Sequence, residues 1–432
     1  MSSCKFFFRT LGCKVNQYET EAMQKLFEAA GYTAAEEISA ADVVVVNTCT
    51  VTAVSSQKSR QMIRHAAGVN PNAVLVVVGC YAQSEPRVVE KISGVDVIIG
   101  TKDRARIVEL VGQALANRGE KIFRVGNVDD IRTFEELPHA PHRTRAFLKI
   151  EDGCNNFCAY CIIPHVRGRV RSRSLESIRA ECLALKAAGY KEIVLTGIHI
   201  GAYGRDLKGV TLVDAVKTVL DAANPLRLRL GSIESAEMTD ELIALLKTDV
   251  RLCNHVHLPL QSGSDEILRA MRRPYTTKNF SELTARLVDA VPEISIGTEL
   301  IVGFPGETDE NFSETLDFIS KQPFSKIHVF PYSARPGTPA ASMPNQIPPP
   351  LKKSRAADAL TISRLKAKIF SERLIGRTVE IIAETSERGI VDGLTKNYVR
   401  VYVPDDGIEL GAVVTVRVEK IFRDGVFGIH IA

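Results

Sequence analysis

The sequence contains no hydrophobic run long enough to cross a bilayer. Its longest apolar stretches, at residues 42–49 and 73–80, are far shorter than the ~20 residues that a membrane helix needs. The opening residues MSSCKFFFRT include three consecutive phenylalanines but neither an extended apolar region nor a small-residue cleavage site, so we expect no secretory signal peptide. These absences predict a cytoplasmic protein without a membrane segment.

The sequence also has little excess charge of either sign. Its 55 Lys and Arg residues against 51 Asp and Glu residues leave a net charge of +4 over 432 residues, so the overall charge does not by itself predict nucleic-acid binding. No GxxxxGK[ST] loop and no dinucleotide fingerprint with an acidic partner is present. Nucleotide hydrolysis and NAD chemistry are therefore excluded as the main activity.

Cysteine is present in an odd number. Nine cysteines in a large chain without a secretory signal argue against a disulfide framework and favour metal or redox chemistry. The composition, with 45% hydrophobic and 25% charged residues, is typical of a folded protein. A chain of this length predicts two to four domains.

The first hundred residues alternate apolar runs with helical patterns. The runs KFFFRTLG, DVVVVNT, AVLVVVG and DVIIG predict parallel strands, with helices near residues 18–30 and 55–67. A basic segment without sustained periodicity follows at residues 115–144. We predict a parallel α/β domain over residues 1–120 and a linker over 121–145.

Six further strand-like runs, each followed by a helical pattern, lie between residues 147 and 332. Six βα units predict an incomplete barrel rather than the usual eight-unit one, and we place this domain at residues 146–370. The runs TVEIIAE, YVRVYVP, VVTVRVEKI and VFGIHI predict a small β-barrel over residues 371–432. The expected fold class is therefore α/β, with an N-terminal parallel α/β domain, a central partial (βα)6 barrel and a C-terminal small β-barrel.

Three cysteines follow the first predicted barrel strand at the spacing C-x3-C-x2-C. Cys154, Cys158 and Cys161, the barrel triplet, can converge as soft thiolate ligands on one iron–sulfur cluster, and three ligands for four irons leave one iron open. A zinc site with His165 as the fourth ligand, or three buried thiols, is the alternative explanation.

A second set of three cysteines stands after three apolar runs of the first domain. Cys13, Cys49 and Cys80, the N-terminal triplet, should meet at one edge, because ligands collect at the carboxyl ends of parallel strands. This placement predicts a second three-thiolate cluster. The alternative is three unrelated core cysteines, since cysteine is often buried.

The barrel triplet on a six-unit barrel resembles the radical S-adenosylmethionine superfamily, in which the open iron binds the methionyl group and electron transfer yields a 5′-deoxyadenosyl radical. Two triplets followed by a terminal β-module resemble the radical methylthiotransferase family over essentially the whole chain. The resemblance implies two 4Fe-4S clusters and S-adenosyl-L-methionine as cofactors. The N-terminal triplet would hold the sulfur-carrying cluster, and the terminal module would be a TRAM domain that binds RNA.

Three segments resemble one branch of this family. LGCKVNQYET, PHVRGRVRSR and LTGIHIGAYG are similar to the bacterial threonylcarbamoyladenosine branch, the MtaB type. This resemblance implies transfer of a methylthio group to C2 of N6-threonylcarbamoyladenosine next to the anticodon of tRNA. The alternatives are isopentenyladenosine in tRNA, an aspartate of a ribosomal protein, or a non-catalytic iron–sulfur RNA-binding protein. The implied partners are the tRNA anticodon stem-loop, a flavodoxin- or ferredoxin-type electron donor and a sulfur source, with no membrane.

Barrel enzymes assemble their sites at the carboxyl ends of strands, so polar residues and glycines there are candidate contacts for S-adenosylmethionine. In relatives these strand ends contact the methionyl group, the ribose and the adenine. Each glycine also has an alternative role in backbone conformation. The candidates are Thr196, Gly197, Ser232, Glu234, Gln261, Ser262, Gly297, Thr298 and Gly303.

Local basic charge supplies the candidate RNA contacts. Residues 143–179 contain eight Lys or Arg against three acidic residues, and alternating arginines beside the active site would suit phosphate binding. Residues 370–432 carry eight basic and ten acidic residues, so RNA binding there would depend on individual side chains. The candidates are Arg167, Arg169, Arg171, Arg173, Lys396, Arg400, and, less directly, Tyr398 and Arg417.

Four further residues stand apart from these sets. His199 follows a predicted strand end, where it could contact substrate or move protons, although a hydrogen-bonded loop histidine is the more common case. Cys4, Cys182 and Cys253 belong to neither triplet, and we expect no ligand role for them.

Overall fold

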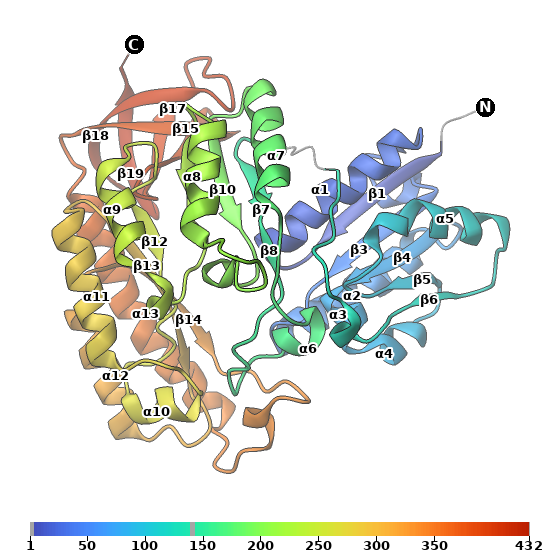
Figure 1. Cartoon of the computed structure of the whole chain (residues 1–432), viewed down its shortest axis with the longest axis horizontal. Helices are drawn as coiled ribbons and strands as arrows, with labels where there is room; N and C mark the ends of the chain where they lie inside the picture. Colours follow the sequence, from blue (N-terminus) through green and yellow to red (C-terminus); the bar gives the residue numbers. More distant parts are fainter. Residues whose placement is uncertain (1–3, 139–142, 432) are drawn as a thin grey trace.

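The protein, as a computed structural model, is described over residues 4–138 and 143–431. Figure 1 shows an N-terminal α/β part, a central half-open barrel and a terminal β-barrel, which confirms the expected fold class. None of the described helices is both long enough and apolar enough to span a membrane.

The N-terminal part is a six-stranded parallel sheet in the order β2, β1, β3, β4, β5, β6. Its central strands are buried along their whole length, as expected for a parallel sheet that is covered on both faces. Val43 and Val45 pack with α1 and α5 on one face, whereas Val44 and Val46 pack with α2, α3 and α4 on the other. The elements are β1 Lys5–Thr10, α1 Lys14–Ala29, β2 Thr33–Ala34, β3 Val43–Thr48, α2 Ala53–Val69, β4 Val74–Gly79, α3 Cys80–Ser84, α4 Pro86–Glu90, β5 Val95–Ile99, α5 Ile107–Ala116 and β6 Ile122–Arg124.

One prediction for this part is wrong. Strand β6 falls within the segment predicted to be a linker, but it pairs with β5 at the edge of the sheet, with Ile98 opposite Phe123. Only three residues form this strand, which is too short to give a recognisable apolar pattern.

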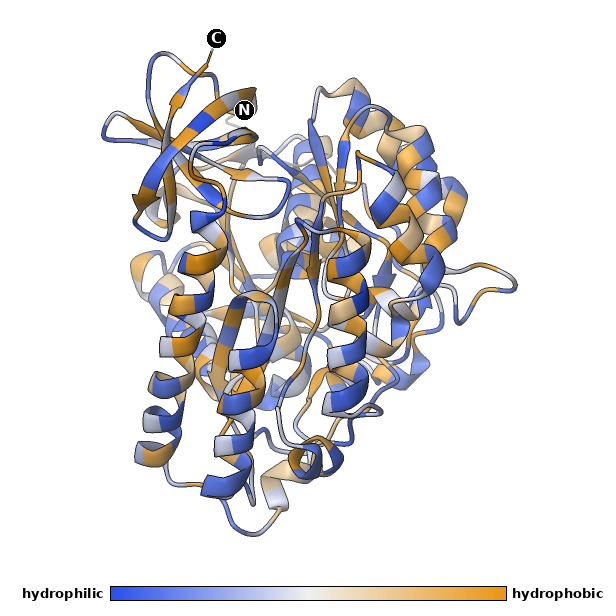
Figure 2. Cartoon of the chain, turned by 90° about the vertical axis from the view of Figure 1, so that its left-hand side faces the viewer, coloured by the Kyte–Doolittle hydropathy of each residue, from blue (hydrophilic) through white to orange (hydrophobic). Residues whose placement is uncertain are grey.

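The central part consists of two three-stranded parallel sheets that form one open half-barrel. The sheets have the orders β11-β10-β7 and β12-β13-β14, and isolated bridges such as Ser232 to His257 join β11 to β12. Helices cover the outer face, and Figure 2 shows hydrophobic and hydrophilic residues alternating along them. The strands are β7 Ala146–Lys149, β10 Glu192–Thr196, β11 Arg227–Arg229, β12 His255–His257, β13 Ser295–Val302 and β14 Phe324–Pro331, and a short antiparallel pair is formed by β8 Glu151–Asp152 and β9 Arg171–Ser172.

Several helices of the half-barrel begin at threonines that cap them. Thr211, Thr276 and Thr308 each accept a hydrogen bond from the backbone three residues later, in complete capping boxes. The helices are α6 Ile163–Arg167, α7 Leu175–Ala187, α8 Leu212–Ala222, α9 Asp240–Thr248, α10 Asp265–Ala270, α11 Thr277–Ala290, α12 Asp309–Lys321 and α13 Pro349–Glu372.

The terminal part is a closed barrel in the order β15-β16-β17-β19-β18. Its second strand was not predicted, because IVDGLT places Asp and Gly inside the strand. A Cβ atom at Gly393 would lie 2.2 Å from the carbonyl oxygen of Ile382, so the neighbouring strand leaves room only for glycine. The strands are β15 Thr378–Glu387, β16 Ile390–Thr395, β17 Arg400–Pro404, β18 Val413–Phe422 and β19 Gly425–His430.

The N-terminal part packs directly against the half-barrel. Tyr18 of α1 forms a buried apolar cluster with Phe147 of β7 and Val194 of β10. At the start of α3, Cys80 packs with Ile162 and Val166 at α6. Figure 1 shows α6 between the two parts, so the loop that carries the barrel triplet reaches the sheet that carries the N-terminal triplet.

Candidate functional site

The N-terminal triplet lies at the carboxyl ends of three adjacent strands. Cys13 follows β1 and precedes α1, Cys49 directly follows β3, and Cys80 begins α3 directly after β4. Strands β1, β3 and β4 are neighbours, and the chain reverses its direction of progress through the sheet between β1 and β3. Such a switch point is where open parallel sheets bind ligands.

The backbone beside Cys13 is shaped for close approach. Gly12 has φ +110°, and a Cβ atom there would lie 2.9 Å from Cβ of Cys49. Only glycine suits this position, for both conformation and space. Cys80 is 3% exposed and burial raises the pKa of its thiol to about 12, although Arg167 acts in the opposite direction. Cys13 is exposed, so the triplet is open on one side.

The barrel triplet lies in the loop between β8 and α6. The amide of Cys154 donates to the carbonyl of Gly168, and that of Cys161 donates to the carbonyl of Cys158, both at 3.0 Å. Burial raises the pKa of the Cys161 thiol to about 12, and the nearby Cys158 and Cys154 add to this effect. Within the described ranges, no three His, Cys, Asp or Glu side chains are arranged around a single metal ion.

Two charged residues contact the sulfurs of this triplet. Nδ1 of His199 lies 3.5 Å from Sγ of Cys154, and Nε2 lies 2.9 Å from Oε2 of Glu237. Burial opposes a charge on the imidazole, but these two hydrogen bonds outweigh it and raise the pKa of His199 to about 10. Nη1 of Arg273 donates to Sγ of Cys158 at 3.3 Å, and Arg273 also pairs with Glu234.

A buried acid stands next to the same loop. Glu151 accepts a hydrogen bond from the His199 amide through Oε2 at 2.6 Å, whereas its Oε1 is buried and makes no hydrogen bond to any described residue. Burial raises the pKa of Glu151 to about 8. A Cβ atom at Gly197 would lie 2.9 Å from Oε2 of Glu151, so glycine keeps this space open.

Sequence reasoning did not identify Glu151 or Arg273. The acidic pair directly before Gly153 and Cys154, in IEDGC, was the available signal for Glu151. Arg273 follows α10 and carries no motif, because only the fold brings it to Cys158.

The predicted cofactor contacts divide into two groups. Thr196 and Gly197 end β10 beside Glu151, and Glu234 reaches the barrel triplet through Arg273. Ser232 is exposed at the end of β11. Thr196, Gly197 and Glu234 therefore lie near the barrel triplet.

Three other predicted contacts have internal partners in the structure, and a cofactor role for them stays a prediction. Thr298 is fully buried and donates to the carbonyl of Leu258 at 2.6 Å. Ser262 is 1% exposed and lies 3.4 Å from Oγ1 of Thr315 in α12. Gly303 has φ +72° in a turn, where a Cβ atom would meet the side chain of Lys352.

Gly297 and Gln261 lie on the concave face of the half-barrel. A Cβ atom at Gly297 would lie 2.9 Å from Nδ1 of His257. Gln261 has φ +68°, in the left-handed region, and its Nε2 lies 3.4 Å from a carboxylate oxygen of Glu299. Glu299 in turn lies 3.4 Å from Nε2 of His257, so a polar surface faces the interior of the half-barrel.

The structure does not support an exposed stripe of RNA-binding arginines for three of its four predicted members. Arg167, Arg171 and Arg173 are each at most 5% exposed, because they pair with acidic residues inside the protein. Arg169 alone is exposed, and its guanidinium lies 4.7 Å from the centroid of the Phe157 ring. The alternating arginines Arg167, Arg171 and Arg173 belong to a buried network of ion pairs rather than to an exposed surface.

The candidate RNA contacts of the terminal barrel are also engaged within the protein. Nζ of Lys396 donates to the carbonyl of Val250 at 3.2 Å, and Arg400 pairs with Asp392. The ring of Tyr398 stacks on His255 at 4.4 Å between centroids. Lys396 and Tyr398 therefore dock the terminal barrel on the half-barrel, whereas Arg400 pairs within the terminal barrel. These contacts do not support the prediction of RNA contacts by Lys396 and Arg400.

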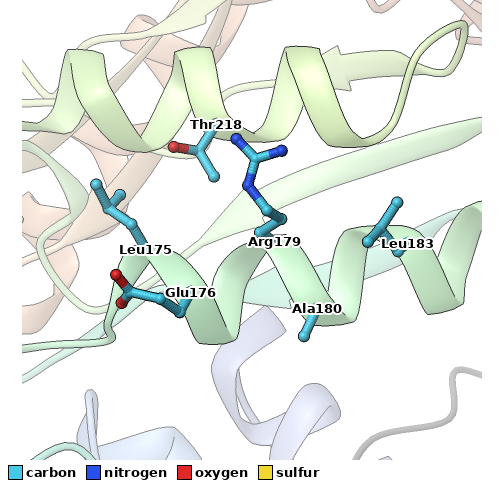
Figure 3. Close-up of a pocket in the computed structure, with 6 residues that line it drawn as sticks. All are labelled: Leu175, Glu176, Arg179, Ala180, Leu183 and Thr218. Atoms are coloured by element: carbon cyan, nitrogen blue, oxygen red, sulfur yellow. The ribbon is translucent and has the colours of Figure 1, made fainter.

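A surface hollow of about 420 Å³ lies away from both triplets. Figure 3 shows its lining side chains on α7 and α8, with Arg179 and Thr218 facing one another across it. No cysteine lines it, and it forms no part of the site.

Two family profiles match this chain. The Uncharacterized protein family UPF0004 matches residues 5–100, which contain the N-terminal triplet. The Radical SAM superfamily matches residues 148–319, which contain the barrel triplet. Fold, cysteine positions and profile together define a radical S-adenosylmethionine enzyme with an additional N-terminal cysteine site.

Relatives along almost the whole length identify the family. The threonylcarbamoyladenosine tRNA methylthiotransferase MtaB of Bacillus subtilis is 44% identical over 96% of this chain and 93% of its own length. The corresponding protein of Aquifex aeolicus is 37% identical over 91% of this chain and 95% of its own length. A tRNA-2-methylthio-N(6)-dimethylallyladenosine synthase of Desulfitobacterium hafniense is 34% identical over 96% and 95%. The chain belongs to the radical S-adenosylmethionine tRNA methylthiotransferase family, whose cofactors are S-adenosylmethionine and two 4Fe-4S clusters.

Solved structures support the fold at lower identity. The radical S-adenosylmethionine methyltransferase TsrM of Kitasatospora setae superposes with a TM-score of 0.59 at 17% identity, covering 78% of this chain and 77% of that chain. At this identity the similarity concerns the arrangement of helices and strands alone.

Proposed function

We propose that this enzyme adds a methylthio group to C2 of N6-threonylcarbamoyladenosine next to the anticodon of tRNA. The observation that carries the proposal is the 44% identity, over 96% of the chain, to a relative named for this reaction. The placement of two cysteine triplets on adjacent parts supports it, because the reaction needs a radical source and a sulfur source close together.

The N-terminal and barrel triplets are the proposed cluster ligands. Each triplet offers three free thiols, which suits a 4Fe-4S cluster with one open iron. Three cysteines of such a cluster bind three different irons, so they stand farther apart than the ligands of one ion. The lack of a single-ion arrangement in the described part of the chain is consistent with clusters and disfavours the zinc alternative.

The methionyl end of S-adenosylmethionine fits beside Glu151. Its buried Oε1, which no described residue contacts, can accept a hydrogen bond from the amino group of the ligand, and Gly197 leaves space for it. When bound, the clusters and S-adenosylmethionine supply the radical that removes hydrogen and the sulfur that replaces it. His199 and Arg273 hold the sulfurs of Cys154 and Cys158 by hydrogen bonds, which orient cluster ligands.

The proposed contacts with tRNA, an electron donor and a sulfur source rest on the resemblance to the family and on the exposure of one arginine. Arg169 is the exposed arginine beside the barrel triplet, and we assign it to a phosphate of the anticodon stem-loop. A flavodoxin- or ferredoxin-type donor would deliver electrons, and a separate sulfur source would restore the N-terminal cluster. A cytoplasmic location is part of the proposal, because tRNA is the proposed substrate.

The test uses anaerobically reconstituted protein with reductant, S-adenosylmethionine and bulk tRNA that lacks methylthio groups. Digestion and mass spectrometry of the nucleosides should show a methylthio gain on threonylcarbamoyladenosine alone. A gain on isopentenyladenosine instead, as the names of relatives at 34% identity allow, would assign the other branch. Formation of 5′-deoxyadenosine without a changed nucleoside would indicate a protein substrate, and neither product would leave a non-catalytic RNA-binding protein.

A further inference from the structure

Arg167 lies between the two cysteine sites, and its side chain contacts the N-terminal one. It ends α6, six residues after Cys161, and is fully buried. Its Nε donates a hydrogen bond to Sγ of Cys80 at 3.2 Å, and its Nη2 donates to Oδ1 of Asn16 at 2.7 Å. Asn16 in turn donates to the carbonyls of Leu11 and Thr48, which shortly precede Cys13 and Cys49 in the chain.

The backbone next to Arg167 holds the other site. The carbonyl of Gly168 accepts the amide of Cys154 at 3.0 Å. One residue before Arg167, the carbonyl of Val166 accepts the hydroxyl of Thr101, in the N-terminal part, at 2.6 Å. Three consecutive residues therefore contact both cysteine loops and the sheet of the N-terminal part.

The charge on Arg167 is compensated without Cys80. Glu19 accepts from Nη1 and Nη2, and Asp152 lies 3.2 Å from Nη1. Buried ion pairs contribute little net stability. We therefore attribute this network to holding the Arg167 guanidinium in a fixed position rather than to stabilising the fold. The planar guanidinium reaches Cys80 through Nε, Glu19 through Nη1 and Asn16 through Nη2, whereas an ammonium group donates all of its hydrogen bonds from one nitrogen and lacks this fixed fork.

We propose that Arg167 is a positioning residue, which aligns the Cys80 corner of the N-terminal site with the barrel triplet and stabilises added negative charge at the Cys80 sulfur. The inference rests on the proposed role of Cys80 as a cluster ligand. A cluster gains one electron on reduction, so a cationic donor to its thiolate raises the reduction potential. If the two cysteine sites were misaligned, the enzyme would still form the radical but would transfer sulfur less often.

The first measurement is the reduction potential of the N-terminal cluster in the full chain carrying Cys154→Ala, Cys158→Ala and Cys161→Ala. Adding Arg167→Met should lower this potential at unchanged iron content. Adding Cys80→Ala instead should reduce the iron content. Iron retained after Cys80→Ala would overturn the assignment of Cys80 as a cluster ligand. An unchanged potential after Arg167→Met, with iron lost after Cys80→Ala, would overturn the role of Arg167 alone.

The second measurement is the ratio of 5′-deoxyadenosine to methylthiolated nucleoside in the otherwise native enzyme. Arg167→Met should raise this ratio about tenfold, the scale at which partners of cluster ligands act. Arg167→Lys keeps the charge and should fold if Arg167→Met does not, yet it should also raise the ratio, because lysine cannot span the three partners. A wild-type ratio in a folded Arg167 variant would overturn the proposal.

Arg104→Met is the matched control. Arg104 is 1% exposed and belongs to the same network, pairing with Glu19 at 3.3 Å and with Glu135 at 2.9 Å. It is not among the described contacts of Cys80. Its loss should lower stability while leaving the potential and the product ratio at wild-type values; equal effects from both arginines would overturn the specific role of Arg167.

Discussion

Nδ1 of His199 lies 3.5 Å from Sγ of Cys154, while Nε2 of the same ring lies 2.9 Å from Glu237. The imidazole is therefore held in place from one side and contacts a proposed cluster ligand with the other. This is the arrangement by which outer residues orient metal ligands.

Replacing His199 by Phe should preserve cluster binding, because all three cysteines remain, and should slow 5′-deoxyadenosine formation by about tenfold. Iron content and the initial rate of S-adenosylmethionine cleavage measure the two effects. His165→Phe is the control, since His165 is exposed and packs against the Phe157 ring at 5.5 Å. Loss of metal in the His165 variant would instead support the alternative of a zinc site with His165 as a ligand.

The two cysteine triplets should have separable functions. Cys158→Ala should abolish 5′-deoxyadenosine formation, because it removes a ligand of the radical-generating cluster. Cys49→Ala should leave that formation intact but stop methylthio transfer. Both products are quantified by mass spectrometry in one anaerobic reaction. Cys182→Ala is the control, because Cys182 is buried within α7, away from both triplets, and 5′-deoxyadenosine formed by the Cys158 variant would contradict the assignment.

The buried network should make stability depend on acid pH. Burial favours protonation of Glu19, but Arg104, Arg167 and Lys149 outweigh it and lower its pKa from 4.5 to about 2. A carboxyl group with a lowered pKa contributes stability fully above its unfolded pKa, and this contribution is lost as pH falls from about 4.5 to about 2.

Glu19→Gln should lower the free energy of unfolding by about 3 kcal/mol at pH 7, because it leaves buried cations without a partner. It should also flatten the dependence on pH between 4.5 and 2. Urea denaturation at several pH values measures both effects. Glu28→Gln on the same helix, where Glu28 and Lys25 form a partly exposed pair, should change stability by less than about 0.5 kcal/mol. Equal effects of the two substitutions would contradict the network.

Tyr398 should anchor the terminal barrel. Its ring stacks on His255 at 4.4 Å, and the guanidinium of Arg229 lies 4.8 Å from its centroid. Tyr398→Ala should lower the free energy of unfolding by about 2 kcal/mol, because truncating a half-buried aromatic side chain removes less packing than truncating a fully buried one. Tyr398→Phe keeps the stacking and should stay within about 1 kcal/mol of wild type, so a large loss in the Phe variant would contradict anchoring through the ring.

Local patterns were sufficient where a strand is long and apolar. The runs around Val43–Thr48 and Val74–Gly79 predicted the central strands of the sheet, and their ends located Cys49 and Cys80. Short or polar strands were missed, because β6 has three residues and β16 contains Asp392 and Gly393. Strands β6 and β16 form because they pair with neighbouring strands, and the local sequence does not show these pairings.

Side-chain roles beyond the cysteines were predicted less well, for a related reason. Arg167, Arg171 and Arg173 alternate as an exposed strand would, yet they are buried by acidic partners. Thr298 was predicted to line the cofactor site but turns outward to the Leu258 carbonyl. A residue at a strand end can point toward the interior of the half-barrel or away from it. The sequence alone does not show which of these two directions its side chain takes.

The sequence by itself determined the fold class, the family and the positions of both cysteine triplets, because strand periodicity and C-x3-C-x2-C spacing are local properties. Only the tertiary structure decided which partners the triplets have. Arg167 meets Cys80 across 87 positions and Glu19 across 148, and Arg273 meets Cys158 across 115. Contacts over such separations arise from the packing of whole domains, which brings buried charges together wherever they can compensate one another.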